Sequence, residues 1–267
     1  MANLAILLEP AKGKQPGGNP FAPDMFDYRT SGTFNYFEDL NPDRRELIDT
    51  LQEAIEDEAQ AETIFDLDGP ELSEALRVNR ELYDAPLMSA LDRYSPGVMY
   101  ASMDFANLPT GAQRRLLENG IILSGLFGLL RPDDLIPNYQ LGMEAEVSEI
   151  GAVADFWRPR ISPLLNEALD GRFVWDLLPS VHSNAWDDEH AYEGRVRVTF
   201  ETDDGEAPGD EDLKVLRGQL VNFIVQETAE SLEAFEEWEH PEGYAFDEDA
   251  TTYDEDTKTW SVLITQA

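Results

Sequence analysis

The sequence predicts a mixed α/β fold in which residues 1–267 form a single domain, with a β-sheet flanked by helices and carrying a ligand cleft. Short apolar runs of strand length alternate with longer segments of helical periodicity, which is the pattern of α/β proteins. The hydrophobic share of 42% and the aromatic share of 10% are those of a globular protein with a core. No low-complexity linker or internal repeat divides the 267 residues.

The N-terminal half begins with an apolar run at residues 3–8, which predicts a first strand followed by a glycine- and proline-rich loop. Helical spacing predicts helices over residues 41–61, 71–82, 85–94 and 109–119, and the apolar triplet 98–100 predicts a strand. The run Ile121–Leu130 contains two glycines within four residues, which disfavours a regular helix. We therefore expect a buried strand that turns at Ser124 and Gly125.

The C-terminal half continues the alternation. A helix is expected over 151–169, strands over 173–177, 195–201 and 260–264, and helices over 212–227 and 231–238. Val196, Val198 and Phe200 alternate with polar residues, so one face of their strand should pack on the core.

The charge of the chain is its most unusual feature. Fifty-five acidic residues against nineteen basic ones give a formal net charge of −36, and only four of the bases are lysine: Lys12, Lys14, Lys214 and Lys258. A folded protein this acidic repels itself at low salt, and concentrated cations screen that repulsion. We therefore expect a halophilic protein of a salt-rich cytoplasm. An ordinary acidic protein, or one that binds cations or a basic partner, is the alternative.

Neither export nor membrane contact is predicted. Met1 leads into the apolar residues 4–8 without a basic region or a small-residue cleavage site, so this start is typical of a strand rather than a signal peptide. The longest apolar run is shorter than the roughly 18 residues of a membrane span. Cysteine is absent, which excludes disulfides, a thiolate nucleophile and a cysteine metal site. We expect a cytoplasmic protein that uses no cofactor.

Two segments present basic groups suited to an anion. Lys12 follows the first predicted strand, and ligands of α/β sheets bind at the carboxyl ends of strands. A solvated loop lysine is the alternative. Small residues at Ser124 and Gly125 allow close backbone approach, and Arg131 beyond them offers a bidentate fork for phosphate or carboxylate. A packing glycine and a structural salt bridge explain this second segment equally simply.

Two further segments are less specific. Lys214 and Arg217 share one helical face in an acidic background, which favours an anionic ligand, although pairing with Asp210 or Glu211 is an equal alternative. The acidic tail over residues 236–249 offers carboxylates and a histidine to a hard or borderline metal. Because acids are dense throughout the chain, a hydrated surface is the simpler interpretation, and we predict no metal site.

These segments, in this order, resemble the YaaA family of peroxide-stress proteins. The family has a Pro-Ala-Lys turn after its first strand and a Ser-Gly-Leu-Tyr-Gly-x-Leu-Arg-Pro-x-Asp block. The corresponding segments here are Pro10–Lys12 and Ser124–Asp134. Shorter family elements match at Phe156-Trp157, Leu165–Leu169, Arg217-Gly218 and Gly243–Asp247.

Three positions depart from the family pattern. Gln140 stands where the family has the arginine of its Pro-Tyr-Arg-Leu-x-Met element. Asn222 stands where a second arginine follows the Arg-Gly pair. His182 closes a stretch, 176–182, that matches the family's Asn-Leu-Ala-Ser-x-Glu-Tyr only loosely. Each departure changes a polar or positive group that the resemblance implies for the cleft.

The resemblance implies a positively lined cleft and a role in peroxide stress, in which the family limits damage from unincorporated iron and has been associated with DNA. DNA protection is therefore the first hypothesis. Its anion contacts would be Lys12, Arg131, Lys214 and Arg217, with Ser124 and Gly125 shaping the floor of the cleft.

An enzyme acting on a small anionic substrate, such as a nucleotide or nucleobase, is the second hypothesis. The feature that would distinguish this enzyme from a DNA-binding protein is a closed pocket in which a carboxylate of perturbed pKa lies beside the bases. Asp133, Asp134 or Asp176 would then serve as general base. Iron binding by the acidic tail is the third hypothesis. The resemblance implies no particular reaction, so no catalytic residue and no enzyme class is predicted.

Overall fold

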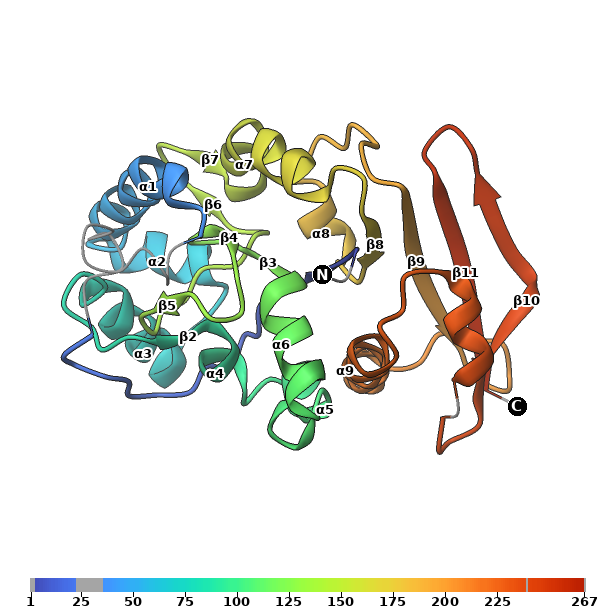
Figure 1. Cartoon of the computed structure of the whole chain (residues 1–267). Helices are drawn as coiled ribbons and strands as arrows, with labels where there is room; N and C mark the ends of the chain where they lie inside the picture. The colour runs from blue at the N-terminus through green and yellow to red at the C-terminus, as the bar shows by residue number, and fades with distance from the viewer. Residues whose placement is uncertain (1–2, 23–35, 239, 267) are drawn as a thin grey trace.

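The centre of the molecule is a seven-stranded mixed β-sheet (Figure 1), seen in a computed structural model that describes residues 3–22, 36–238 and 240–266. In spatial order the strands are β10 (Tyr244–Asp254), β11 (Thr259–Gln266), β9 (Gly194–Glu201), β8 (Phe173–Asp176), β1 (Leu4–Leu8), β3 (Gly120–Ser124) and β4 (Gly128–Leu130). The five inner strands are parallel, and each edge strand is antiparallel to its neighbour. The predicted mixed α/β fold class is confirmed.

Helices and short segments surround this sheet. The longer helices are α1 (Asn41–Ala54), α2 (Glu58–Phe65), α3 (Gly69–Arg80), α6 (Thr110–Asn119), α7 (Val153–Leu169) and α9 (Asp210–Glu227). The shorter ones are η1 (Glu38–Leu40), α4 (Ala90–Tyr94), α5 (Val98–Ser102), η2 (Phe105–Asn107), α8 (Ser180–Ser183) and η3 (Leu232–Glu237). Two small sheets pair β2 (Met88–Ser89) with β5 (Leu135–Ile136) and β6 (Glu146–Val147) with β7 (Gly151–Ala152). Helices α1–α3 and the β10–β11 hairpin lie at opposite ends of the molecule (Figure 1). Among the described residues, no helix has the length and apolar character to cross a membrane.

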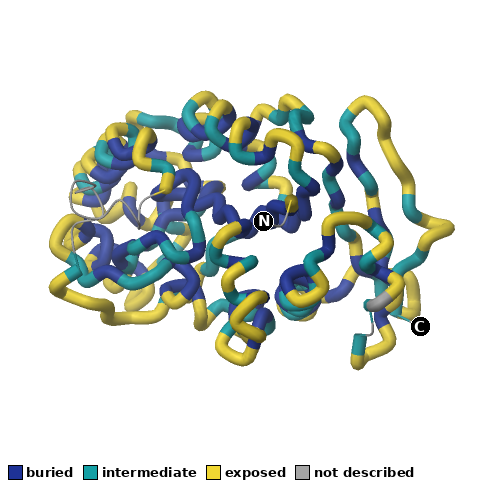
Figure 2. The backbone as a smooth tube through the Cα atoms, in the orientation of Figure 1, coloured by how far each residue is buried: buried dark blue, intermediate teal, exposed yellow. Residues whose placement is uncertain are grey.

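Strand β1 lies in the middle of the core. All five of its residues are fully buried (Figure 2), as expected for a continuous apolar run in a parallel sheet that is covered on both faces. The chain passes from β1 to β3 on one side and later returns to β8 on the other. Strand order therefore reverses at β1, and open α/β sheets bind ligands beside the carboxyl ends of strands at such a point.

The structure confirms most of the predicted elements, including the turn between β3 and β4. The predicted helix over 41–61 is two helices, because the Asp57 side chain accepts a hydrogen bond from the amide of Ala59 (3.0 Å) and caps a new helix, α2. The strand predicted at 98–100 is wrong, since these residues lie in helix α5. Packing of α5 against α9 outweighs the strand preference of Val98 and Tyr100.

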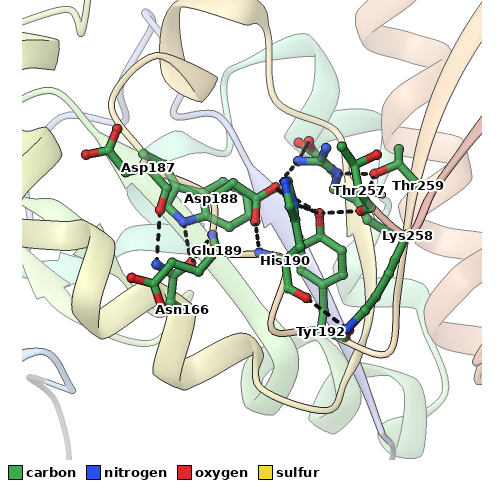
Figure 3. A network of polar contacts seen from close by, with 12 residues as sticks. Asn166, Asp187, Asp188, Glu189, His190, Tyr192, Thr257, Lys258 and Thr259 are labelled. Carbon is green, nitrogen blue, oxygen red and sulfur yellow. Dashed lines mark hydrogen bonds and ion pairs between the residues drawn. The ribbon is translucent and has the colours of Figure 1, made fainter. Parts of the chain in front are cut away.

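A polar network joins the connection between β8 and β9 to the turn between β10 and β11 (Figure 3). Lys258 donates hydrogen bonds to the carbonyl oxygens of His190 (3.0 Å) and Tyr192 (3.1 Å). Asp188 accepts hydrogen bonds from the Tyr192 hydroxyl (2.8 Å) and from Nη1 of Arg195 (2.7 Å). His190 and Lys258 both have left-handed backbone angles, with φ of 54° and 48°. The network holds these strained residues in place, so one of the four lysines has a structural role.

Candidate functional site

Three adjoining hollows surround the loop that follows β1. The first, of about 230 Å³, lies between this loop, α5 and α9. The second, of about 460 Å³, extends toward His182, and the third, of about 630 Å³, extends toward α3. Lys12 borders all three hollows, and Lys14 borders the second and third. We call the three together the β1 cleft.

A buried ion pair lies at the first hollow. Nη1 of Arg217 is 3.3 Å from Oε1 of Glu9, and the two side chains are only 18% and 15% exposed. Burial raises the pKa of Glu9, and the positive charges of Arg217 and Lys214 oppose that rise. The backbone carbonyl of Glu9 accepts a hydrogen bond from the Tyr100 hydroxyl (2.7 Å). The cleft therefore holds a fixed carboxylate of perturbed pKa beside two bases.

Helix α9 brings Lys214 and Arg217 to the cleft through close packing on α5. A Cβ atom on Gly218 would clash with the backbone carbonyl oxygen of Met99 in α5. Glycine at this position lets the two helices approach, and Arg217, directly before it, and Lys214, one turn earlier on α9, then lie beside the loop after β1. The Arg-Gly pair therefore combines a charged side chain with the glycine that positions it.

A chain of buried hydroxyl groups lies beneath Lys14. The Tyr139 hydroxyl is 2.8 Å from Oγ of Ser124 and 2.7 Å from the Tyr94 hydroxyl. Oγ of Ser124 also accepts hydrogen bonds from two backbone amides of the turn after it, at 3.1 and 3.2 Å. The Ser124 proton is then directed to Tyr139, whose ring is fixed in place. Nζ of Lys14 lies 4.3 Å from the centre of that ring.

Gly125 packs closely behind Leu141 and Gly142, which line the second hollow, and we call this the floor contact. An added Cβ atom there would lie 2.6 Å from the carbonyl carbon of Gly142 and 2.7 Å from the carbonyl oxygen of Leu141. Only glycine lets the turn after β3 meet the loop that forms the wall. This contact is the close approach that the small residues of the apolar run predicted.

Replacing Gly125 with alanine is expected to lower the free energy of unfolding by about 1–3 kcal/mol, because backbone on both sides must move. The measurement is urea denaturation at fixed high KCl. Gly111→Ala in α6 is the matched control, since its nearest contact is Nη1 of Arg115 at 3.7 Å. The control should be neutral or slightly stabilising, because alanine favours the helix. Equal effects at both glycines would contradict the floor contact.

The structure brings Lys12, Lys214 and Arg217 to one cleft. Ser124 and Gly125 do not line it, because they lie buried behind the lining residues Tyr139 and Gly142. The Lys12 side chain is 88% exposed, and its Nζ is 3.9 Å from Oε1 of Glu144. It therefore stands at the mouth of the cleft, free to rotate toward any of the hollows.

Arg131 lies elsewhere. Its Nη1 donates to the carbonyl oxygens of Glu118 (2.7 Å) and Gly120 (3.3 Å), at the amino end of β3. Ser124 ends the same strand, about 13 Å away at 3.3 Å per residue. The expected convergence of Arg131 with the other bases is wrong, because its guanidinium ties helix α6 to the start of β3.

The candidate general bases are also dispersed. Asp133 and Asp134 follow Arg131 at the same end of the sheet, and the Asp134 carboxylate accepts the Arg131 amide hydrogen (2.7 Å). Asp176 ends β8, where Oδ2 is 3.3 Å from Nε of Arg197. None of the three lines the β1 cleft as described. Of the carboxylates that do line it, Glu9 is the one whose pKa burial raises, so it is best suited to proton transfer there.

Comparison with known proteins identifies the family of the chain. The model of the family described as "Peroxide stress protein YaaA" matches residues 4–250, a range that contains every residue of the β1 cleft. The chain belongs to the YaaA family.

Relatives of this YaaA-family chain carry the name UPF0246. One from Streptomyces coelicolor is 30% identical over 188 residues, which is 68% of this chain and 67% of that protein. One from Corynebacterium glutamicum is 32% identical over 206 residues, or 74% of this chain and 76% of that protein. One from Flavobacterium johnsoniae is 31% identical over 162 residues, or 57% of this chain and 62% of that protein.

Two of the three residues that depart from the YaaA pattern border the β1 cleft, and the third does not. Gln140 borders the second and third hollows, and His182 borders the second. His182 is buried, none of the described residues offers a hydrogen-bond partner to its ring nitrogens, and burial lowers its pKa to about 4. The Asn222 side chain instead donates to the carbonyl oxygen of Met103 (2.7 Å), so it ties α9 to the end of α5.

Sequence reasoning missed Glu9, Tyr94 and Tyr139 as parts of this YaaA-family site, and it noted Lys14 only as a surviving lysine. Tyr94 and Tyr139 lie 45 residues apart, and no pattern along the chain links them. Glu9 is one of fifty-five acids, so the presence of an acidic residue at this position does not indicate a functional site. The scarcity of lysine was the one usable signal for Lys14.

Proposed function

We propose that this YaaA-family protein acts in the peroxide-stress response by binding a small anionic ligand, of nucleotide size, in the β1 cleft. The observation that carries the proposal is the group formed by Glu9, Lys214 and Arg217. A buried carboxylate of raised pKa beside two bases is the feature that separates a small-molecule site from an open groove. The hollows of 230–630 Å³ also fall within or near the range of small-ligand pockets.

Electrostatics favour a compact ligand held by direct contacts. A net charge of −36 repels any anion at long range, so attraction must come from bases that touch the ligand. Lys12 and Lys214 border the same hollow, and Arg217 lies behind them on Glu9. When Glu9 is protonated below its raised pKa, Arg217 loses its counter-ion and becomes available to the ligand. Anion affinity should therefore rise as the pH falls through that pKa.

Arg217→Met is expected to weaken the binding of ADP, AMP or inorganic phosphate by roughly 10- to 150-fold, because a charged hydrogen bond contributes about 1.5–3 kcal/mol. The measurement is isothermal titration calorimetry at an acidic pH, where Glu9 is protonated, and at a KCl concentration where circular dichroism shows a folded protein. Arg114→Met, on an arginine whose side chain is 75% exposed in α6, is the control and should bind like the unchanged protein. No binding of any probe, or equal binding by the Arg217 variant, would refute the proposal.

DNA protection is the second candidate, and the continuity of the cleft favours it. Lys12 borders all three hollows, so a backbone with several phosphates has a continuous path along the loop after β1. Fluorescence anisotropy with duplex and bulged DNA from 0.1 to 3 M KCl separates the candidates. DNA binding that persists in the folded protein, falls in Arg217→Met and is not matched by nucleotides would favour this second function. Phosphate contacts weaken with salt, so the slope of the logarithm of the DNA affinity against the logarithm of the KCl concentration gives the number of phosphate contacts.

The remaining expectations stay predictions. The resemblance implies that the protein limits iron-dependent damage, and a salt-rich cytoplasm explains the acidic surface. The acidic tail over residues 236–249 runs from η3 into β10. Within the described residues, no group of three or more histidine, aspartate or glutamate side chains is placed to hold a metal ion.

A further inference from the structure

Within the part of the chain that the structure describes, Lys14 lacks the ion pair that a lysine ammonium usually forms, and only aromatic ring faces and one carbonyl oxygen are placed to accept its charge. Its Nζ lies 4.3 Å from the centre of the Tyr139 ring and 5.9 Å from that of Tyr94, and it donates a hydrogen bond to the carbonyl oxygen of Lys12 (3.3 Å). Among the described residues, no carboxylate lies within ion-pair distance of this Nζ. In a chain with fifty-five acids and four lysines, a lysine that shares its hollows with several carboxylates and yet pairs with none of the described ones needs an explanation.

The charged neighbour of Lys14 is a second cation. Arg93 on α4 is buried, and its guanidinium donates to the carbonyl oxygens of Gln15, Pro86 and Ile136, so it cannot turn away. The rings of Tyr94, also on α4, and Tyr139 lie beside the amine. The two hollows that Lys14 borders are also lined by His182 and by the carboxylates of Asp66, Glu71, Glu74, Glu144 and Glu146, none of which is within ion-pair distance of its Nζ. Burial and the charge of Arg93 lower the pKa of Lys14 to about 7. A far larger share of the amine is then neutral at pH 7 than for an ordinary lysine.

The amine is accessible and rigidly placed. Lys14 is half-buried and borders both the second and the third hollow of the β1 cleft, at the place where they share Tyr139. The Tyr139 ring is fully buried and held through its hydroxyl by Ser124 and Tyr94. An amine resting on this ring therefore has a defined position at the junction of two cavities. Neutral, desolvated and fixed amines are the nucleophiles of covalent lysine catalysis.

We propose that Lys14 is a nucleophile that forms an imine with a small aldehyde or ketone that also carries a phosphate or carboxylate. Nζ attacks the carbonyl carbon and forms a C–N bond. The carbonyl oxygen takes up the two protons that the nitrogen loses and leaves as water, and a C=N bond remains. No electron is gained or lost overall. Lys12, at the mouth of both hollows, is placed to hold the anionic group. The inference rests on the proposed function, because it assigns chemistry to the same cleft.

Reductive trapping tests the imine directly. The full chain is treated at pH 7 with pyridoxal 5′-phosphate, an aldehyde with a phosphate, and cyanoborohydride, and the labelled lysine is located by peptide mass spectrometry. With only four lysines, each serves as an internal reference for the others. Lys14 should be labelled at least about tenfold faster than Lys12 or Lys258. Its labelling rate should level off above pH 7 to 8, whereas the rate at Lys12 should keep rising. Labelling of Lys14 no faster than Lys12 would overturn the proposal.

Variants and a second probe separate this inference from the proposed function. Lys14→Arg keeps the charge and should lose the fast label, while Lys258→Arg should keep it. Pyridoxal, which lacks the phosphate, should label Lys14 more slowly than its phosphate does. Fast and equal labelling by both aldehydes would overturn the anionic substrate while leaving the nucleophile in place. ADP binding without preferential labelling of Lys14 would overturn the imine and leave the proposed function standing.

Discussion

Arg44→Met is expected to lower the free energy of unfolding by about 3–5 kcal/mol, because it removes a buried charge from a set of backbone acceptors. Arg44 on α1 is fully buried and donates to the carbonyl oxygens of Phe127 (2.9 Å) and Leu129 (2.7 Å). Burial lowers its pKa only to about 10, so the guanidinium stays charged at neutral pH. Strand β4 is an edge strand, and α1 supplies these hydrogen bonds in place of a further strand. Methionine would fill much of the space and leave both carbonyls without a donor.

Urea denaturation at fixed KCl measures the change in the free energy of unfolding. Urea leaves the ionic strength constant, whereas guanidinium chloride is a salt and would raise it. Arg114→Met is again the control, because its exposed i,i+4 pair with Glu118 contributes at most about 0.5 kcal/mol. Since β4 follows the turn that makes the floor contact, Arg44→Met should also weaken ligand binding in the folded protein. A loss of stability below about 1 kcal/mol would show that the edge carbonyls find other partners.

The fold was largely predictable because its strands differ clearly in pattern from its helices. Two strands show this. The continuous apolar run of β1 predicts a strand that is buried on both faces, and the alternation of Val196, Val198 and Phe200 predicts that β9 is buried on one face. Helix α5 was not predictable in this way. Its five residues look like a strand, and their conformation depends on α9, more than a hundred residues later. Local preference decides long, regular segments, and distant packing decides short ones.

The candidate site was predictable where chain geometry fixes position. Lys12 follows a central parallel strand, and that alone places it at the ligand edge of the sheet. The position of Arg131 was wrongly predicted because this residue lies beyond the β3–β4 turn. Strand β4 runs antiparallel to β3, so the residue after β4 lies toward the amino ends of the parallel strands, away from the cleft. Once the turn at Ser124 and Gly125 is predicted, that outcome follows from direction alone. The contacts of Lys14 with Tyr94 and Tyr139 depend instead on helix α4 and two loops meeting, which no periodicity encodes.

Raising KCl from 0.1 to 3 M is expected to raise the melting temperature by about 10 °C or more. The chain has fifty-five acids and nineteen bases, so its many unpaired carboxylates repel one another across the surface of the folded protein. Unfolding relieves that repulsion because the chain expands. The screening length is about 10 Å at 0.1 M and below about 3 Å above 1 M, so most of this repulsion disappears in concentrated salt. Circular dichroism on heating, repeated across the salt series, measures the effect. A melting temperature indifferent to salt would exclude the adaptation to a salt-rich cytoplasm.

Salt also strengthens hydrophobic burial, so a charge-reduced variant is needed to identify the cause. Glu248, Asp249 and Glu255 are exposed on the β10–β11 hairpin, far from the β1 cleft in the sheet order. Changing them to Gln, Asn and Gln removes three negative charges with little change in shape. If repulsion is the cause, this variant melts higher than the unchanged protein at 0.1 M and at the same temperature at 3 M. If the salt effect is hydrophobic, the two melting curves shift in parallel, because the buried apolar surface is the same in both.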